Sequence, residues 1–474
     1  MDRQGLYQLL TRSFGFVPTD GQRTVLYHLA AFLLSEKSHP TYLLQGYAGT
    51  GKTTLVTTLV DTLPQVGMRY QLMAPTGRAA KVLSGYTGKN ASTIHRKLYR
   101  FQQHADGSLH MTRAENKAKN TVFIVDECSM ISDETSNGRS LLDDLINYVF
   151  SSENCRLLLI GDNAQLPPVG LENSPANDIK VLKNEFGLTV ASYELTEVMR
   201  QEEESGILWN ATDLRTALMA LRPLTPLFRT DGFSDVHRIE PQEFEELLWQ
   251  KFGDKTSNEA VIICRSNKRA NMYNQAVRAR ILQEEGEIAT GDKLMVVKNN
   301  YFWTDEDQKI SFIANGDMIE LMRINNTEEM YGFHFADVDI QLTDYQEEPN
   351  LSVKILLETL TSDSPALTPE ESERLYRAVE EDYMDIPNKR DRYKAMRQNP
   401  YFNALQVKFG YALTCHKTQG GQWPSVFIDA PFIPDGESLQ ISDLRWFYTA
   451  VTRAQKQLYF VNFPEEYFQS PHLR

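Results

Sequence analysis

The sequence predicts an α/β protein, with parallel sheet and flanking helices, that is interrupted by a β-rich insertion. Three observations support this fold class. Residues 46–54 form a glycine-rich loop between an apolar strand and a helix. Apolar strands then alternate with helices to about Arg200 and resume at Ala260, a pattern typical of parallel sheets. From about residue 291 to residue 407 the pattern changes to short strands separated by turns.

Length and composition set the first limits. A chain of 474 residues exceeds one ordinary hydrophobic core, so about two to four domains are expected. No stretch approaches the roughly 18 apolar residues that a membrane-spanning helix needs, which predicts a protein without a membrane partner. The cysteines are single and scattered, a spacing that predicts neither a zinc site nor a disulfide framework. We therefore expect a reducing, cytoplasmic location. These cysteines are Cys128, Cys155, Cys264 and Cys415.

Charge is distributed unevenly along the chain. The net charge is −14, from 49 basic and 63 acidic residues, which by itself argues against a nucleic-acid partner. Residues 78–119, however, contain nine basic and two acidic residues, and residues 261–283 contain five basic residues and no acid. A binding channel needs only a positive lining. The distribution is therefore compatible with nucleic-acid binding.

The glycine-rich loop has the sequence G-Y-A-G-T-G-K-T-T. Its glycines let successive N–H groups face one anion, Lys52 reaches the β- and γ-phosphates, and Thr53 can hold Mg²⁺. The alternative is a glycine-rich strand-to-helix turn that binds no ligand. It does not explain why every fixed position of the phosphate-loop pattern is filled. The predicted nucleotide-binding residues of the loop are Gly46, Gly49, Thr50, Gly51, Lys52, Thr53 and Thr54.

Gln22 stands at the expected start of a helix, before the loop. A glutamine amide can hydrogen-bond N6 and N7 of adenine, so Gln22 is a candidate for selecting ATP. An exposed helix glutamine without this role is an equally good interpretation.

Two further strands end in candidate catalytic residues. Residues 121–125 are followed by Asp126 and Glu127, which suit a water-held Mg²⁺ and a base for the attacking water. Gln165 follows the strand at residues 156–160, where an amide can sense the γ-phosphate.

Thr76 and Thr93 precede two helices in the basic segment. Free N–H groups at helix starts can bind a phosphate. Plain N-capping is the alternative for both threonines, and the two roles are compatible. Arg265 and Asn267 lie at a similar strand-to-helix start and are predicted phosphate contacts for the same reason.

Residues 99–113 predict a small hairpin. A three-residue loop at residues 105–107, with Gly107 left-handed, would pair Phe101 with Met111 and Gln103 with Leu109 on one face. A two-residue loop would instead split these apolar groups between the two faces.

The motifs occur in a specific order along the chain. They are residues 46–54, A-P-T at 74–76, V-D-E at 125–127, G-D at 161–162 with Gln165, L-T-E-V-M-R-Q at 195–201, T-C-H-K-T-Q-G at 414–420 and Y-T-A-V-T-R-A at 448–454. This order resembles the superfamily 1 DNA helicases of subgroup B, and most closely their RecD-like and Dda-like members. The β-rich insertion matches least well.

The resemblance implies two RecA-like domains and an SH3-like β-barrel. The first RecA-like domain is expected at residues 1–200, with the hairpin at about 99–113 acting as a strand-separating pin. The second is expected at residues 201–290 and 408–474. The insertion at residues 291–407 includes a charged helical stretch, 366–398, broken at Pro387.

The resemblance also implies roles for individual residues, with ATP and Mg²⁺ as cofactors. Lys52 and Glu127 act in catalysis with Gln165, while Arg200 and Arg453 from the second domain contact the γ-phosphate. Gln419 and Gly420 add to the nucleotide site, and Thr53 and Asp126 hold the metal. For Trp423, a buried position is favoured over stacking on a base. The expected DNA contacts are Thr76, Thr93, His95, Phe101, Arg265, Asn267, Thr414 and Lys417.

The sequence therefore predicts an ATP-dependent DNA helicase, a monomer that moves on single-stranded DNA and opens duplex forks. The resemblance implies 5′-to-3′ polarity. Three alternatives stay open: an RNA helicase, a translocase that does not separate strands, and a motor or regulatory subunit in a DNA repair nuclease complex with protein partners.

Overall fold

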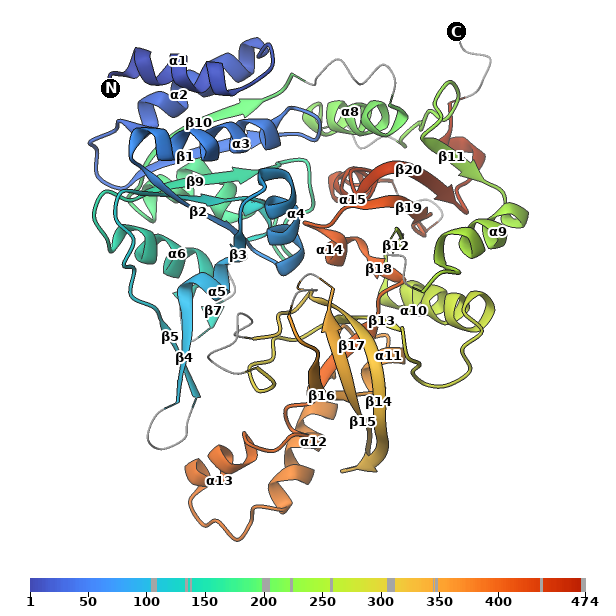
Figure 1. Cartoon of the computed structure of the whole chain (residues 1–474). Coiled ribbons are helices and arrows are strands. Elements are labelled where there is room, and N and C mark those ends of the chain that lie inside the picture. Colours follow the sequence, from blue (N-terminus) through green and yellow to red (C-terminus); the bar gives the residue numbers. More distant parts are fainter. Residues whose placement is uncertain are drawn as a thin grey trace.

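The computed structural model contains two parallel sheets and a β-barrel (Figure 1). It describes residues 1–103, 109–132, 135–136, 139–197, 205–221, 225–255, 259–304, 312–343, 345, 348–434 and 438–469. The predicted α/β fold class, with a hairpin and a β-rich insertion, is confirmed.

The first sheet has six parallel strands in the order β10-β1-β9-β6-β2-β3. Along the chain they are β1 (Pro40–Gly46), β2 (Arg69–Ala74), β3 (Ala91–Thr93), β6 (Thr121–Val125), β9 (Arg156–Gly161) and β10 (Thr189–Leu195). Its helices are α1 (Arg3–Ser13), α2 (Asp20–Leu33), α3 (Lys52–Thr62), α4 (Gly77–Thr87), α5 (Ile94–Leu98), α6 (Leu141–Phe150) and α7 (Ile179–Asn184). We call this sheet and its helices the first unit.

Both faces of the first sheet are covered, so its central strands are apolar throughout rather than alternating. In β1, Tyr42 and Leu44 pack into a core cluster that includes α1, α2 and α3. Leu43 points to the opposite face and packs against α5 and α6. This two-sided burial explains why short apolar runs identified these strands.

The second sheet has five parallel strands in the order β11-β20-β19-β12-β18. They are β11 (Val236–Ile239), β12 (Ala260–Cys264), β18 (Ala412–Thr414), β19 (Trp423–Asp429) and β20 (Ala454–Val461). Its helices are α8 (Gly206–Met219), α9 (Pro241–Phe252), α10 (Asn267–Ala276), α14 (Cys415–Thr418) and α15 (Ile441–Val451). We call this sheet and its helices the second unit.

A closed five-stranded barrel interrupts the second unit between β12 and β18. Its strands are β13 (Lys293–Val296), β14 (Met318–Met330), β15 (Phe333–Leu342), β16 (Leu351–Leu356) and β17 (Leu405–Phe409). Between β16 and β17 lie α11 (Glu358–Thr361), α12 (Pro369–Glu381) and α13 (Lys389–Met396). Pro387 falls between α12 and α13, as the predicted break requires.

The predicted hairpin is formed by β4 (Tyr99–Gln103) and β5 (Leu109–Arg113). Its antiparallel register pairs Phe101 with Met111 and Gln103 with Leu109, as predicted. The proposed three-residue loop falls within residues 104–108, which lie outside the described residues. In Figure 1 the hairpin projects from the first unit beside α5. A second small hairpin pairs β7 (Thr135–Ser136) with β8 (Arg139–Ser140).

Among the helices of the described residues, none is both long and apolar enough to cross a membrane. All four cysteines are buried and free.

Candidate functional site

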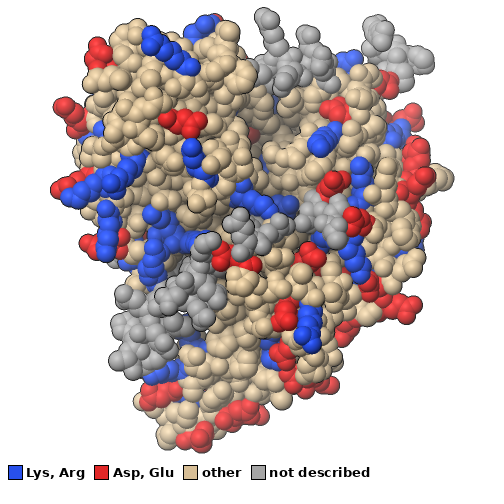
Figure 2. Space-filling view, in the orientation of Figure 1, with Lys and Arg blue, Asp and Glu red and all other residues tan. Residues whose placement is uncertain are grey.

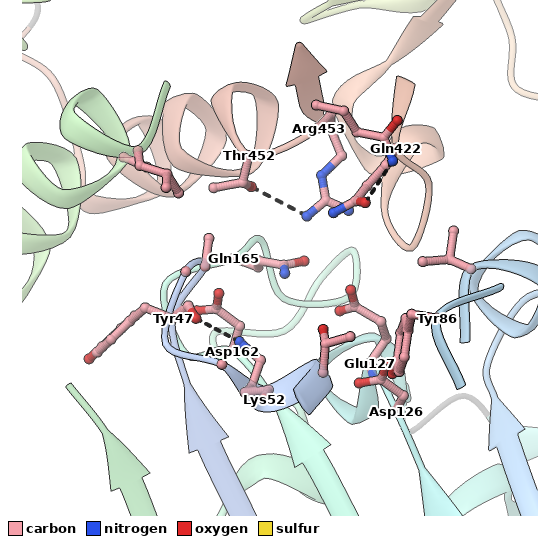
Figure 3. A pocket seen from close by; sticks show the side chains of 18 of the residues that line it. Tyr47, Lys52, Tyr86, Asp126, Glu127, Asp162, Gln165, Gln422, Thr452 and Arg453 are labelled. Atoms are coloured by element: carbon pink, nitrogen blue, oxygen red, sulfur yellow. Dashed lines mark hydrogen bonds between the residues drawn. The ribbon is translucent and has the colours of Figure 1, made fainter. Parts of the chain in front are cut away.

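The predicted catalytic residues meet at one edge of the first sheet. Because β1, β6 and β9 are parallel neighbours, their carboxyl ends open onto the same crevice. A cavity of about 1120 Å³ lies there. The first unit contributes Lys52, Asp126, Glu127 and Gln165 to its lining, and the second unit contributes Arg453. Figure 3 shows Arg453 on one side of the cavity and the other labelled catalytic residues opposite it.

The phosphate loop adopts the curled conformation that its glycines permit. Gly49 and Gly51 have φ angles of 79° and 82°, in the region that favours glycine. Lys52 Nζ donates to the carbonyl oxygens of Gly46 at 2.5 Å and Tyr47 at 2.8 Å. These acceptors are neutral, and a charged phosphate oxygen binds an ammonium group more strongly. The ammonium group is therefore already positioned where a phosphate can bind it.

Most predicted residues of the loop line the cavity: Gly49, Gly51, Lys52, Thr53 and Thr54. Gly46 and Thr50 shape the loop instead, and the buried Thr50 hydroxyl donates to Tyr47 O at 2.8 Å.

Gln419 and Gly420 were predicted for the nucleotide site, but the structure places them elsewhere. Gln419 lines a second cavity and donates to Leu166 O at 2.6 Å. Gly420 packs on α4, where an added Cβ would lie 2.7 Å from Ala79 Cβ. The reason is the turn after α14, where Gly420 has φ 71° and directs the chain toward α4.

Gln22 supports the phosphate loop. Its side chain is 1% exposed, so the interpretation as an exposed helix glutamine is wrong. Its Oε1 accepts from Thr19 N in a capping box, and its Nε2 donates to Thr50 O at 3.1 Å. Gln22 thereby fixes the start of α2 against the loop. Its proposed role in adenine selection stays a prediction.

Glu127 follows β6 in a left-handed conformation, with φ 53°. Burial raises the pKa of Glu127 to about 7, and the nearby carboxylates of Asp126 and Asp162 add to this effect. Arg453 and Lys52 act in the opposite direction on the same pKa. A carboxyl group that titrates near neutral pH is well suited to accept a proton from water.

Gln165 carries an unsatisfied acceptor into the cavity. Its Oε1 is buried and has no hydrogen-bond partner among the described residues. Buried acceptors without a partner are rare in folded proteins. A bound water or another donor in the cavity would satisfy this atom.

Arg453 is 3% exposed, so it does not form a surface ion pair. Its guanidinium donates to Thr449 O at 3.1 Å, Gly421 O at 3.2 Å and Thr452 Oγ1 at 3.3 Å. These neutral acceptors hold the group in the cavity without neutralising its charge. The other predicted arginine, Arg200, lies outside the described residues.

Four predicted DNA contacts meet in the second cavity, of about 460 Å³: Thr76, Thr93, His95 and Lys417. Ala74 pairs with Thr93 in the register of β2 and β3, so the two threonines leave the same sheet edge. Both also cap helices, because Thr76 accepts from Ala79 N and Thr93 from Arg96 N. Their capping role is therefore real, and it leaves DNA contact open as a prediction.

The barrel closes one side of this second cavity. Asn315 Oδ1 accepts from Lys417 Nζ at 2.7 Å, and the Phe312 ring lies edge-on to His95. Burial lowers the pKa values of Lys417 and His95.

The remaining predicted contacts lie farther along the second sheet. Cys264 pairs with Thr414, so Arg265, which follows β12, lies beside Thr414, which ends β18. Asn267 begins α10. Arg265 lines a separate cavity of about 1000 Å³ and forms an ion pair of 2.5 Å with Asp443. The side chain of Phe101 lies outside the described residues.

Basic and acidic side chains occupy different parts of the face shown in Figure 2. In Figure 2, Lys and Arg gather at the left and centre, over the α4 and α5 side of the first unit. Asp and Glu are concentrated along the right edge and the bottom.

Trp423 is 4% exposed, and the Arg78 guanidinium lies 3.8 Å from its ring centroid. The favoured interpretation of Trp423 as a buried residue is confirmed. The contact joins α4 of the first unit to β19 of the second.

Sequence reasoning gave no role to Tyr86 and Tyr448. Tyr86 donates to Asp126 across 40 positions of sequence, and no motif includes Tyr86. Tyr448 belongs to a motif, but its contact with Asp162 across 286 positions has no sequence signal.

Two family models match the chain. The AAA domain family matches residues 19–222, and the UvrD-like helicase C-terminal domain matches residues 409–461.

Individual proteins are also similar. The ATP-dependent DNA helicase dda of Enterobacteria phage T4 is 24% identical, over 94% of this chain and 99% of its own length. The ATP-dependent RecD2 DNA helicase of Deinococcus radiodurans is 32% identical over 42% of this chain, which spans only 25% of that protein. A crystal structure of Pif1 helicase from Bacteroides, in complex with ADP-AlF3 and single-stranded DNA, is 14% identical with a TM-score of 0.48. That comparison covers 96% of this chain and 95% of the Pif1 chain.

The first family match covers the phosphate loop and the carboxylates after β6, and the second covers the strand and helix that present Arg453. Together with the dda helicase, which aligns over nearly the whole chain, these matches make the chain similar to the superfamily 1B DNA helicases, and among them to the RecD-like and Dda-like members.

Proposed function

We propose that this ATP-dependent DNA helicase hydrolyses ATP between its two units and uses the energy to move 5′ to 3′ along single-stranded DNA. One observation carries the proposal. Lys52 and Glu127 of the first unit face Arg453 of the second unit across a single cavity.

Within this cavity, each side chain has a distinct task. Lys52 binds the β- and γ-phosphates, and Glu127 accepts the proton of the attacking water. The free Oε1 of Gln165 orients that water or senses the γ-phosphate. Arg453 stabilises the negative charge that develops on the transferred phosphoryl group, with Arg200 as a second candidate for this task.

The cavity also fits a magnesium ion. The Thr53 hydroxyl and the Asp126 carboxylate both line it, and oxygen ligands of this kind are those that Mg²⁺ prefers. When bound with ATP, the ion would neutralise part of the phosphate charge. Asp126 would hold it through water and Thr53 directly.

Hydrolysis depends on the approach of the two units, because the proposed base and the proposed arginine belong to different sheets. Closure of the cleft completes the site, and product release allows it to open. Such a cycle converts hydrolysis into relative motion.

We further propose that single-stranded DNA crosses the edge where Thr76, Thr93, His95 and Lys417 meet. Helix N-termini and a lysine provide phosphate contacts at this edge. Residues 1–200, residues 201–290 with 408–474, and residues 291–407 would act as the three domains of the motor.

The decisive experiment uses forked duplexes with only a 5′ tail or only a 3′ tail. We expect ATP-dependent unwinding of the 5′-tailed substrate alone. Unwinding of only the 3′-tailed fork contradicts the polarity. Single-strand movement without unwinding identifies a translocase, and a preference for RNA tails identifies an RNA helicase. ATP turnover that single strands do not stimulate favours a regulatory subunit.

A further inference from the structure

Helix α4 connects the two cavities. Thr76 caps its N-terminus, and Thr76 and Arg78 line the cavity with the proposed DNA contacts. In its C-terminal half, Val82, Gly85 and Tyr86 line the nucleotide cavity. One helix of 11 residues therefore presents residues to both.

The last turn of α4 contacts the proposed metal-binding carboxylate. Tyr86 donates its phenolic proton to Asp126 Oδ2 at 2.6 Å, and Figure 3 shows Tyr86 beside Asp126 and Glu127. The other oxygen, Asp126 Oδ1, accepts from Glu127 N at 2.9 Å. With a donor on each oxygen, the carboxylate has one defined orientation.

Tyr86 is itself held in place. The Thr57 hydroxyl of α3 lies between two acceptors, Thr53 O at 3.0 Å and Tyr86 O at 3.4 Å. On the same helix, Lys81 Nζ donates to Thr343 O of the barrel at 2.8 Å, and Arg78 packs on Trp423. Contacts with three parts of the molecule thus fix the helix that carries the phenol.

We propose that Tyr86 is a positioning residue that orients the Asp126 carboxylate for the metal–nucleotide complex. The proposal rests on the proposed assignment of Asp126 to Mg²⁺. Hydrogen bonds to ligating carboxylates are part of a metal site, and their loss typically lowers metal affinity about 10- to 100-fold.

The test replaces Tyr86 with phenylalanine, which removes the hydroxyl and keeps the ring. Binding of a fluorescent ADP analogue is measured during a MgCl₂ titration and again in EDTA. We expect Tyr86→Phe to raise the half-saturating Mg²⁺ concentration about tenfold or more. Nucleotide affinity in EDTA should stay within about twofold of the parent.

Tyr401→Phe is the matched control. It removes a phenol that donates to the Glu328 carboxylate at 2.9 Å, but this pair lies in the insertion. The control should behave as the parent does in both titrations.

Each outcome separates this inference from the proposed function. If Mg²⁺ does not strengthen nucleotide binding to the parent, the assignment of Asp126 itself fails. If the parent responds but Tyr86→Phe has an unchanged or lower half-saturation, only the role of Tyr86 is overturned. If Tyr86→Phe loses the same nucleotide affinity with and without Mg²⁺, Tyr86 only supports the pocket. This result also overturns its proposed role in orienting Asp126. In an Asp126→Asn background, adding Tyr86→Phe should cause no further shift.

Discussion

The phenolic hydroxyl of Tyr448, on α15 of the second unit, donates to Asp162 Oδ2 of the first unit at 2.8 Å. The phenolic oxygen of Tyr448 also accepts from Ala48 N in the phosphate loop, at 2.8 Å. The next residue, Thr449, accepts from Leu166 N at 2.8 Å. Two consecutive side chains of one helix therefore hold the phosphate loop and the segment after β9 against the second unit.

This relationship predicts that Tyr448→Phe weakens closure of the cleft. A buried hydrogen bond to a charged group contributes about 1.5–3 kcal/mol, so DNA-stimulated kcat for ATP should fall roughly tenfold. Tyr459→Phe is the control, because Tyr459 stacks on Phe427 within the second unit. A parent-like kcat in Tyr448→Phe, measured in a coupled ATPase assay, would show that this contact does not govern closure.

Glu127 should impose a pH dependence on ATP hydrolysis. Its pKa of about 7 means that the base is protonated and inactive at acidic pH, so kcat/KM should rise as the pH increases through about 7. Glu127→Gln should bind ATP but not hydrolyse it, whereas Lys52→Ala should not turn over ATP. Turnover near the parent rate in Glu127→Gln, with saturating DNA, excludes Glu127 as the base.

The same group should affect folding stability. The pKa of Glu127 is higher in the folded state than its ordinary value of about 4.5, so the neutral carboxyl group stabilises the fold. This contribution is complete below about pH 4.5 and is lost as the pH rises through about 7. Without nucleotide, Glu127→Gln should therefore melt at a higher temperature than the parent at pH 8. At pH 5 the two melting temperatures should nearly coincide, and a constant difference across this range would contradict the shifted pKa.

Arg453→Ala should lower kcat by about 10³- to 10⁵-fold, the usual effect of losing an arginine finger. ATP affinity should change far less, because the phosphate loop and Lys52 remain. Lys456→Ala removes an exposed cation from β20, the strand that follows Arg453, and should leave kcat unchanged. If kcat falls by a similar small factor in both variants, Arg453 does not stabilise the transition state.

Binding of single strands should weaken with salt despite the net charge of −14. The expected slope is roughly −0.7 per phosphate contact, so Lys417→Ala should reduce it by about that amount. Arg265→Ala should reduce it less, because Asp443 already pairs with Arg265. Lys180→Ala, an exposed cation on α7, serves as the control, and a zero slope for the parent would argue against a DNA channel.

Replacing residues 102–108 with an Asn-Gly turn should separate movement from unwinding. Opening each base-pair step costs about 1.4 kcal/mol, and the hairpin is proposed as the wedge that captures opened pairs. DNA-stimulated ATPase and translocation should persist while unwinding of a tailed duplex falls strongly. If the hairpin merely protects the first sheet, ATPase and thermal stability should fall together with unwinding.

The sequence alone determined the fold class and the main candidate residues. The phosphate loop, Asp126 and Glu127 were identifiable because strand, loop and helix signals are local, and parallel strands bring their ends to one edge. The hairpin register followed from pairing Phe101 with Met111. The resemblance to a helicase family supplied Arg453, whose place in the cavity no local pattern predicts.

Only the tertiary structure decided which side chains meet across the chain. Tyr86 contacts Asp126 because α4 packs beside α3, and Tyr448 reaches Asp162 because the two sheets face each other. Gln419, assigned to the nucleotide by its motif, lies in the other cavity because Gly420 turns the chain toward α4. Such contacts depend on the packing of whole elements, and the identity of a single residue carries almost no information about that packing.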